Sequence, residues 1–308
     1  MSAGRRWGGE WLAWWRGEGA AGRWLPLAAA AGFIAGHAVL GGLRGDHAWL
    51  AAAALAGYYA GPRVRPAFRL LLPLLLVGAV YDAQRYWAED LRGAIRVAEP
   101  HQWELGWFGV PTPEGGTVTP AAWLQGRTRP FWDFVCGAAY LLFIPVFLLT
   151  AAWWRWTGPG RAAEDVMWAM FWLNVAGYAA YLVYPAAPPW YVDRYGLGPA
   201  ILTAAPEAAG AARFDALLGV DWFASYYGRS ANVFGAIPSL HVGQPFLAVL
   251  FAWQFRSLRA VTTLFWMLVF FASVYLNHHY VVDGLVGMVF AVGAWAAVMA
   301  WRRRLSRG

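Results

Sequence analysis

Uninterrupted runs of apolar residues recur along most of this chain, and several are long enough to cross a lipid bilayer as helices. Of the 308 residues, 60% are hydrophobic and only 13% are charged, a balance outside that of soluble globular domains. A membrane β-barrel would show alternating polarity over short strands, whereas these runs are continuous. The sequence therefore predicts an all-α, polytopic membrane protein.

The apolar runs predict about eight transmembrane helices. These are expected over residues 24–42, 47–61, 67–87, 131–154, 166–184, 239–255, 260–277 and 280–301. The second is short and rich in alanine. Two long connections, 88–130 and 185–238, are rich in Pro, Gly and Trp. We expect them to be folded segments that lie against the membrane surface.

Arginine placement predicts the orientation in the membrane. The 24 basic residues are all arginines, and the net charge is +7. With the N-terminus inside, the short inner loops and the tail collect these arginines, as the positive-inside rule requires. Both termini are then cytoplasmic, and both long connections lie outside, in a bacterial-type inner or plasma membrane. A nucleic-acid partner is not expected, because no soluble basic face is visible.

Reactive side chains gather in two short stretches, Pro-Ser-Leu-His at 238–241 and His-His-Tyr-Val-Val-Asp at 278–283. Such groups are costly inside a membrane and indicate function. His279 and Asp283 are four residues apart, so on a helix the carboxylate can accept the imidazole N–H. His241 and His279 both open spans at the outer face. We expect the two imidazoles to face each other across a gap the size of one phosphorus centre, which suits phosphoryl transfer.

The two stretches resemble the signatures of a known family. Residues 235–241 (Gly-Ala-Ile-Pro-Ser-Leu-His) resemble the Pro-Ser-x-His motif of the type-2 phosphatidic acid phosphatase superfamily, and residues 279–283 resemble its His-x3-Asp motif. Leu240, the His-His-Tyr triplet and the Pro-Pro-Trp at 188–190 are similar to the branch that contains fungal inositol phosphorylceramide synthase. The resemblance implies a six-helix lipid-phosphatase-type core. The expected domains are then 1–66 (interfacial segment and extra spans), 67–301 (catalytic) and 302–308 (basic cytoplasmic tail).

The resemblance also implies residue roles. His279 would attack phosphorus and become phosphohistidine, with Asp283 orienting its ring. His241 would protonate the leaving oxygen and then deprotonate the incoming hydroxyl or water. Ser239 and nearby backbone N–H groups would bind phosphoryl oxygens. Pro188, Pro189 and Trp190 would shape a re-entrant turn that lines the lipid pocket. The resemblance implies no metal and no cofactor.

The chain departs from the phosphatase pattern in its cations. Phosphatases of this superfamily carry Lys-x6-Arg-Pro and a Ser-Arg six residues before the nucleophile, but this chain has no lysine and has Ser273 at that position. Another arginine is therefore expected to bind the phosphoryl oxygens. The outer-side candidates are Arg85, Arg92, Arg96, Arg127, Arg129, Arg194, Arg213 and Arg229. We rank Arg85, Arg129 and Arg229 highest, although each could also be an arginine that faces lipid headgroups.

Other polar residues receive weaker interpretations. A carboxylate that binds inositol or sugar hydroxyls could come from Asp82, Glu89, Asp90, Glu99, Glu104 or Asp133. For most of these six, solvated loop charge is the expectation. His278 would point about 100° away from His279 on a helix and is interpreted as structural. His37 and His47 flank the first outer turn, and no chemical role is expected for them.

The sequence thus predicts a membrane lipid phosphotransferase that moves a phosphoryl or phosphoinositol-type headgroup between a lipid and an alcohol. The first alternative is a lipid phosphate phosphatase, with water as acceptor and phosphatidic acid or a polyprenyl phosphate as substrate. Loss of the phosphatase cations favours a phosphodiester donor. A transporter with histidines as a proton relay, and a metalloenzyme with His241, His279 and Asp283 as a facial triad, are rivals from other classes. The sequence leaves the oligomeric state open.

Overall fold

The chain forms two compact helical units, Met1–Ala79 and Val80–Gly308, in a computed structural model that describes residues 3–228 and 232–305. Helices stand at all eight positions where the sequence predicts spans. The all-α membrane class is confirmed. The domain boundaries at 66–67 and 301–302 are a functional division and stay a prediction.

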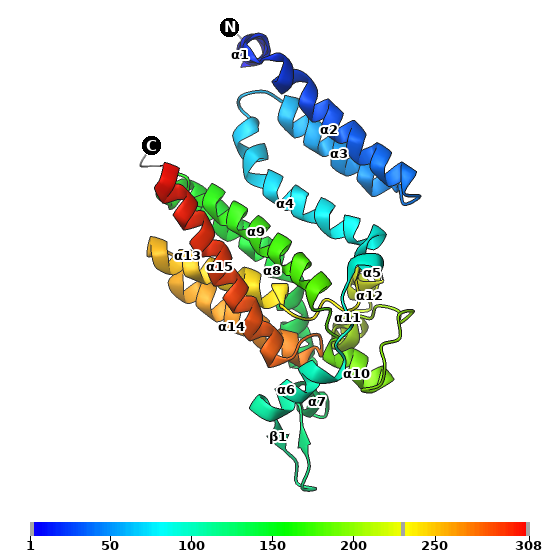
Figure 1. Ribbon diagram of the computed structural model, residues 1–308. Helices are drawn as coiled ribbons and strands as arrows, with labels where there is room; N and C mark the ends of the chain where they lie inside the picture. Colours follow the sequence, from blue (N-terminus) through cyan, green and yellow to red (C-terminus); the bar gives the residue numbers. More distant parts are fainter. Residues whose placement is uncertain (1–2, 229–231, 306–308) are drawn as a thin grey trace. The chain divides into compact units, whose positions relative to one another are not determined.

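The first unit is built from α1 (Ala3–Gly17), α2 (Ala20–Val39), α3 (Gly45–Tyr59) and most of α4 (Arg65–Ala83). Helices α2 and α3 pack side by side as a hairpin (Figure 1). At one end, the Trp11 indole N–H donates to the Tyr59 carbonyl (2.7 Å).

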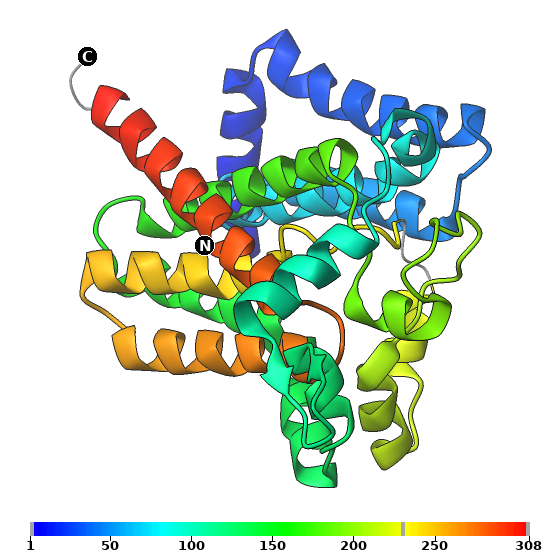
Figure 2. The same cartoon turned by 60° about the horizontal axis from the view of Figure 1, so that its bottom comes forward.

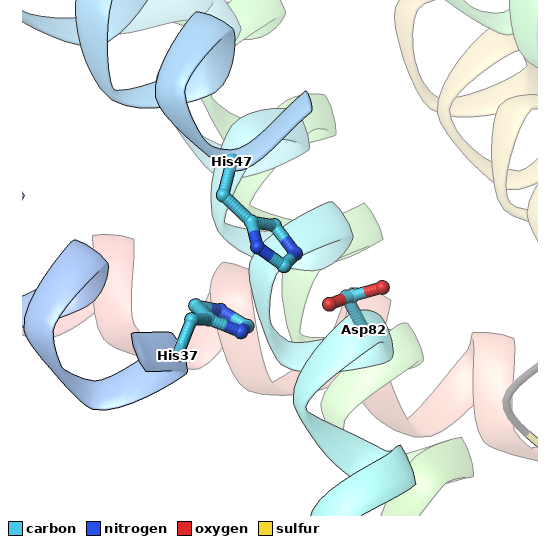
Figure 3. Close-up of side chains that lie close together, drawn as sticks. All are labelled: His37, His47 and Asp82. Atoms are coloured by element: carbon cyan, nitrogen blue, oxygen red, sulfur yellow. The ribbon is translucent and has the colours of Figure 1, made fainter. Parts of the chain in front are cut away.

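At the turn between α2 and α3, the rings of His37 and His47 stack with centroids 3.7 Å apart (Figure 3). His37 and His47 are the buried residues of α2 and α3, whose apolar surface is otherwise largely exposed. A hydrogen bond also fixes the His47 ring to the turn between the two helices, because the Arg44 backbone N–H donates to Nδ1 of His47 (3.2 Å).

The second unit contains a bundle of five long helices. They are α8 (Pro130–Thr157), α9 (Ala162–Val183), α13 (Leu240–Phe255), α14 (Arg259–Tyr275) and α15 (Val281–Leu305). Helix α13 contacts each of the other four and is the central element. Helices α13 and α14 lie side by side in both views, and α15 packs along α13 (Figure 2). The start of α13 and the start of α15 therefore meet at one end of the bundle.

The two long connections are folded, as expected from their composition. The first holds η1 (Gln84–Tyr86), α5 (Ala88–Leu91), α6 (Ala98–Phe108), the antiparallel pair β1 (Val110–Pro111) and β2 (Thr117–Val118), and α7 (Pro120–Gln125). The second holds α10 (Pro189–Tyr195), η2 (Ala209–Ala211), α11 (Ala212–Leu218) and α12 (Trp222–Tyr227). They cover the bundle end where α13 and α15 begin, because α6 packs on α15, α7 on α14 and α11 on α8.

Among the described helices, four are long and apolar enough to cross a membrane by length and composition: Arg65–Tyr86, Pro130–Thr157, Ala162–Val183 and Val281–Leu305. Helix α14 is apolar but shorter. The predicted number of eight spans, and of six helices in the core, stays a prediction.

Candidate active site

The turn before α15 has a defined shape. Helix α14 ends at Tyr275, and Asn277 adopts a left-handed conformation (φ 63°) that asparagine tolerates better than most residues. The Ser273 carbonyl then accepts the backbone N–H groups of both His278 and His279, each at 3.1 Å. These bonds fix the chain reversal and present His279 directly before the first turn of α15.

The starts of α13 and α15 approach very closely. Ser239 caps α13 by accepting the Val242 N–H (3.3 Å), and its own N–H donates to the Asp283 carbonyl on α15 (2.9 Å). Gly287 permits this approach, since a Cβ atom there would collide with the Ser239 carbonyl oxygen. The close crossing places His241, in the first turn of α13, against the turn that carries His279.

The structure brings His241, His279 and Asp283 together. Nδ1 of His241 lies 3.2 Å from Nε2 of His279. On the other side of the His279 ring, Nδ1 faces both the Asp283 carboxylate (3.3 Å) and the Ala236 carbonyl (3.1 Å). Both partners are acceptors, so Nδ1 of His279 carries the proton and Nε2 presents its lone pair. The His241 Nδ1–H then donates to that lone pair.

The direct contact of the two rings differs from the expected gap. An attacking nitrogen and phosphorus stand about 3–3.5 Å apart before reaction, and a hydrogen bond to the leaving oxygen adds further length. Phosphorus and its leaving oxygen therefore do not fit on the line between nitrogens that are 3.2 Å apart. Placing a phosphate group between these two nitrogens would require the His241 ring to withdraw.

Aromatic rings surround the histidine pair. The His241 ring is half-buried and stacks on Tyr140 with centroids 4.3 Å apart, while His279 and Asp283 are buried. His278 lies between the rings of Tyr140 (5.3 Å) and Tyr227 (4.5 Å). Burial lowers the pKa of His278 to about 3, so its ring is neutral. This packing supports the structural interpretation of His278.

The same geometry argues against a facial metal triad. Asp283 binds the Nδ1 side of the His279 ring, whereas His241 faces the Nε2 side. The donors of His241, His279 and Asp283 thus lie on opposite sides of one ring and do not converge on a common point, as metal ligands must.

The three arginines ranked highest as phosphate ligands, Arg85, Arg129 and Arg229, are not brought together at one place in the described structure. Arg85 pairs with Asp82 on the adjoining turn (2.5 Å). Arg129 occupies the N-cap position of α8 without a side-chain capping bond, and its side chain is exposed. Its backbone N–H donates to the Tyr275 hydroxyl (3.0 Å). Arg229 lies outside the described residues. Their binding of phosphoryl oxygens stays a prediction.

Two other arginines lie beside segments that build the site. Arg213 binds Asp133 (2.6 Å) and the Tyr275 carbonyl (3.2 Å), so its charge is already matched. The Arg92 guanidinium lies over the Phe234 ring (5.4 Å), in the segment that leads to Ser239. Within the described part of the chain, Arg92 makes no ion pair.

The Pro188-Pro189-Trp190 element is buried behind the turn that carries His279. Pro188 and Pro189 start α10, and the Trp190 N–H donates to the Asn277 carbonyl (3.1 Å). The Asn277 side chain in turn donates to Asp193 (2.7 Å). The element supports the turn, and a pocket-lining role stays a prediction.

Glu104 is a residue whose position the sequence did not indicate. Its side chain is fully buried, not a solvated loop charge, and it accepts the backbone N–H groups of Val281 (2.9 Å) and Val282 (3.1 Å) at the start of α15. Burial raises the pKa of Glu104 to about 7. Its partners are 177 and 178 positions away, so no local pattern could have revealed the contact.

Two facing imidazoles and a buried carboxylate at one end of a helical membrane bundle are the groups that phosphoryl transfer through a nucleophilic histidine requires. Residues 117–297 match the sequence profile of the PAP2 superfamily, and the chain belongs to this superfamily.

The individual relatives are enzymes of lipid headgroup synthesis. The chain is 34% identical over 257 residues to phosphoinositol dihydroceramide synthase of Bacteroides thetaiotaomicron. The aligned region covers 82% of this chain and 84% of that protein. It is 35% identical over 179 residues to inositol phosphorylceramide synthase of Candida albicans (58% of this chain, 35% of that protein). The catalytic subunit of the Saccharomyces cerevisiae inositol phosphorylceramide synthase is 29% identical over 237 residues (75% and 56%). No solved structure matches the chain.

These findings settle the class of protein. The predicted superfamily and the interpretation as a membrane lipid phosphotransferase, an enzyme that acts on lipid phosphate esters, are confirmed. The transporter interpretation is wrong, because the chain belongs to an enzyme superfamily.

Proposed function

We propose that this enzyme transfers a phosphoinositol-type headgroup from a phosphatidylinositol-like donor to the hydroxyl of a ceramide-type lipid, through a phosphohistidine intermediate on His279. The contact of His241 Nδ1 with His279 Nε2, backed by Asp283, is the observation that carries the proposal. The donor and acceptor classes are supported by the bacterial relative, a phosphoinositol dihydroceramide synthase. The alignment with this chain covers 84% of that relative's length.

In the first half-reaction, the Nε2 lone pair of His279 attacks the donor phosphorus. The N–P bond forms as the bond from phosphorus to the diacylglycerol oxygen breaks. Positive charge develops on the imidazole, and Asp283 stabilises it through Nδ1–H. His241 gives its Nδ1 proton to the departing oxygen, so diacylglycerol leaves as a neutral alcohol.

In the second half-reaction, the acceptor hydroxyl gives its proton to His241 while its oxygen attacks phosphorus. The P–N bond breaks and returns the lone pair to His279. The Ser239 hydroxyl and the backbone N–H groups of Leu240 and His241 are suited to bind the phosphoryl oxygens, because the positive end of the α13 dipole lies there. The N–H groups of Ser239 and Val242 already have partners within the protein. The reaction would occur at the extracytoplasmic face, with both termini in the cytoplasm.

Mass spectrometry of lipid products with purified enzyme tests the proposal. Phosphatidylinositol plus dihydroceramide should give a phosphoinositol ceramide and diacylglycerol, and EDTA should leave the rate unchanged. An acid-labile adduct on His279 should accumulate when the acceptor is omitted. Release of inositol phosphate at the same rate with and without acceptor would identify a hydrolase, and no product from phosphatidylinositol would refute the donor class.

A further inference from the structure

Glu104, a side chain from outside the five-helix bundle, binds the start of α15. Glu104 of α6 points its carboxylate at the Val281 and Val282 N–H groups, which are among the first four N–H groups of a helix and lack partners within it. Each carboxylate oxygen accepts one of them. The side chain is fully buried, so solvent does not reach these hydrogen bonds while Glu104 is in place.

The same helix start holds the groups that orient His279. The Tyr280 N–H donates to the Asp283 carboxylate (2.9 Å), which also faces His279 Nδ1 (3.3 Å). Val281 and Val282 lie between these two residues in sequence. A shift of their backbone would therefore move the carboxylate and the imidazole together.

We propose that Glu104 is a positioning residue for the reaction, holding the first turn of α15 so that Asp283 keeps His279 aimed at phosphorus. Glu104 acts through the backbone and does not itself touch the substrate. This inference rests on the proposed role of His279, but not on the identity of the donor or acceptor lipid.

The electrostatic surroundings make this support depend on pH. Burial raises the pKa of Glu104 to about 7, and the Asp283 carboxylate across from it adds to the rise, while the Val281 and Val282 N–H groups oppose it. The Tyr280 phenol also lies close enough to Glu104 to interact electrostatically with its charge. Burial lowers the pKa of His101, one turn away on α6, and the nearby Asp193 charge partly opposes this. Ionised Glu104 can accept both N–H groups, whereas the protonated acid has a donor in place of one acceptor.

Two substitutions of Glu104 distinguish a role in positioning His279 from a role in protein stability alone. Glu104→Ala removes both acceptors and should lower kcat by about 10- to 100-fold with KM changed less than about twofold, as expected for a displaced catalytic group. Glu104→Gln keeps an oxygen acceptor and removes the titration. Like the protonated acid, its amide offers one acceptor and one donor, so its kcat should match the low-pH level of the wild type and should lack the rise through pH 7 that we expect of the wild type.

Exposed Glu114, in the turn between β1 and β2, is the matched control. Glu114→Gln should match the wild type in kcat and pH profile. Full kcat in Glu104→Ala, or a rise through pH 7 that persists in Glu104→Gln, would overturn the inference. If Glu104→Ala does not fold, the pH profile of Glu104→Gln decides.

Hydrogen exchange without substrate separates this inference from the proposed function. The amides of residues 280–284 should exchange at least about tenfold faster in Glu104→Ala than in the wild type, a loss of protection that reports local opening. Unchanged exchange would overturn the inference even if phosphoinositol transfer is found. Faster exchange with no phosphoinositol transfer by the wild type would refute only the proposed substrates.

Discussion

The two compact units of this protein use apolar helices in different ways. In Arg65–Tyr86, which lies mostly in the first unit, 11% of the most apolar stretch is buried inside the protein, compared with 44%, 50% and 39% in α8, α9 and α15 of the second. The family match lies entirely within the second unit. Apolar composition therefore indicates which helices enter the bilayer, but not which helices pack around a site.

Two glycines, one in each unit, illustrate the difference. A Cβ atom at Gly36 in α2 would meet nothing within 4 Å among the described residues, whereas one at Gly287 in α15 would strike the backbone of α13. Membrane helices approach closely where small residues leave room for the partner backbone. The following predictions test whether function and close packing are confined to the second unit.

The largest effect is expected from His279→Ala. Turnover should fall by about 10⁴-fold or more, because the nucleophile is lost. The variant should still elute as a folded protein in detergent, which size-exclusion chromatography checks. Substantial residual transfer would show that another group attacks phosphorus.

His241→Ala should lower kcat by about 10²- to 10⁴-fold with natural lipid donors, because the leaving oxygen is no longer protonated. Donors with an activated leaving group such as nitrophenol need no proton and should lose much less. Kinetics with both donor types measure the ratio. Equal losses would argue against an acid role for His241.

The same substitution in both units tests the packing contrast directly. Gly287→Ala should lower stability by about 1–3 kcal/mol and also reduce activity, because the α13 and α15 backbones must separate. Gly36→Ala should be neutral or stabilise by about 0.5–1 kcal/mol, since alanine favours a helix and no atom is crowded. Thermal unfolding in detergent compares them. Equal behaviour at the two sites would remove the contrast.

The stability of the second unit should depend on pH through Glu104. The folded-state pKa of about 7 lies above the ordinary value of 4.5, so the protonated form is favoured by folding. Stability should fall as pH rises from about 4.5 through 7, by up to about 3 kcal/mol. Melting temperatures at pH 5.5 and 8 measure the change, and Glu104→Gln should flatten it. An identical slope in that variant would assign the titration elsewhere.

The smallest effect on activity is expected in the first unit. His37→Ala should remove the stacking with His47 and cost about 0.5–1.5 kcal/mol of stability. Activity should stay within about twofold of the wild type, because no chemical role is expected for this pair. A large loss of turnover in well-folded protein would show that the first unit contributes to catalysis.

Part of the molecule follows from local sequence pattern. Helices occupy all eight predicted positions because long apolar runs leave no other way to satisfy the backbone in a bilayer. The spacing of His279 and Asp283 predicted their pairing on one helix. The structure has the pair, but His279 lies in the turn before α15 and only Asp283 lies on the helix. His241 could be associated with them because it opens another predicted span at the same membrane level.

The remainder depends on contacts between distant segments. In the sequence, Glu104 cannot be told apart from the other carboxylates of its loop. Its role is visible only from the contact between α6 and α15. The direct His241–His279 contact follows from the close crossing at Gly287, which span prediction does not describe. The arginines are long and flexible and sit in connections without periodic pattern, so neither spacing nor hydropathy distinguishes a phosphate ligand from a partner of Asp82 or Asp133.

The hydrogen bond between the two imidazoles has a consequence for the idle enzyme. In the proposed mechanism, the His241 N–H covers the Nε2 lone pair of His279 as long as the two rings are in contact. A substrate must exchange this internal bond for its own contact with His241 before attack can begin. In that exchange the two imidazoles would change partners together, His279 to phosphorus and His241 to the oxygen bonded to it.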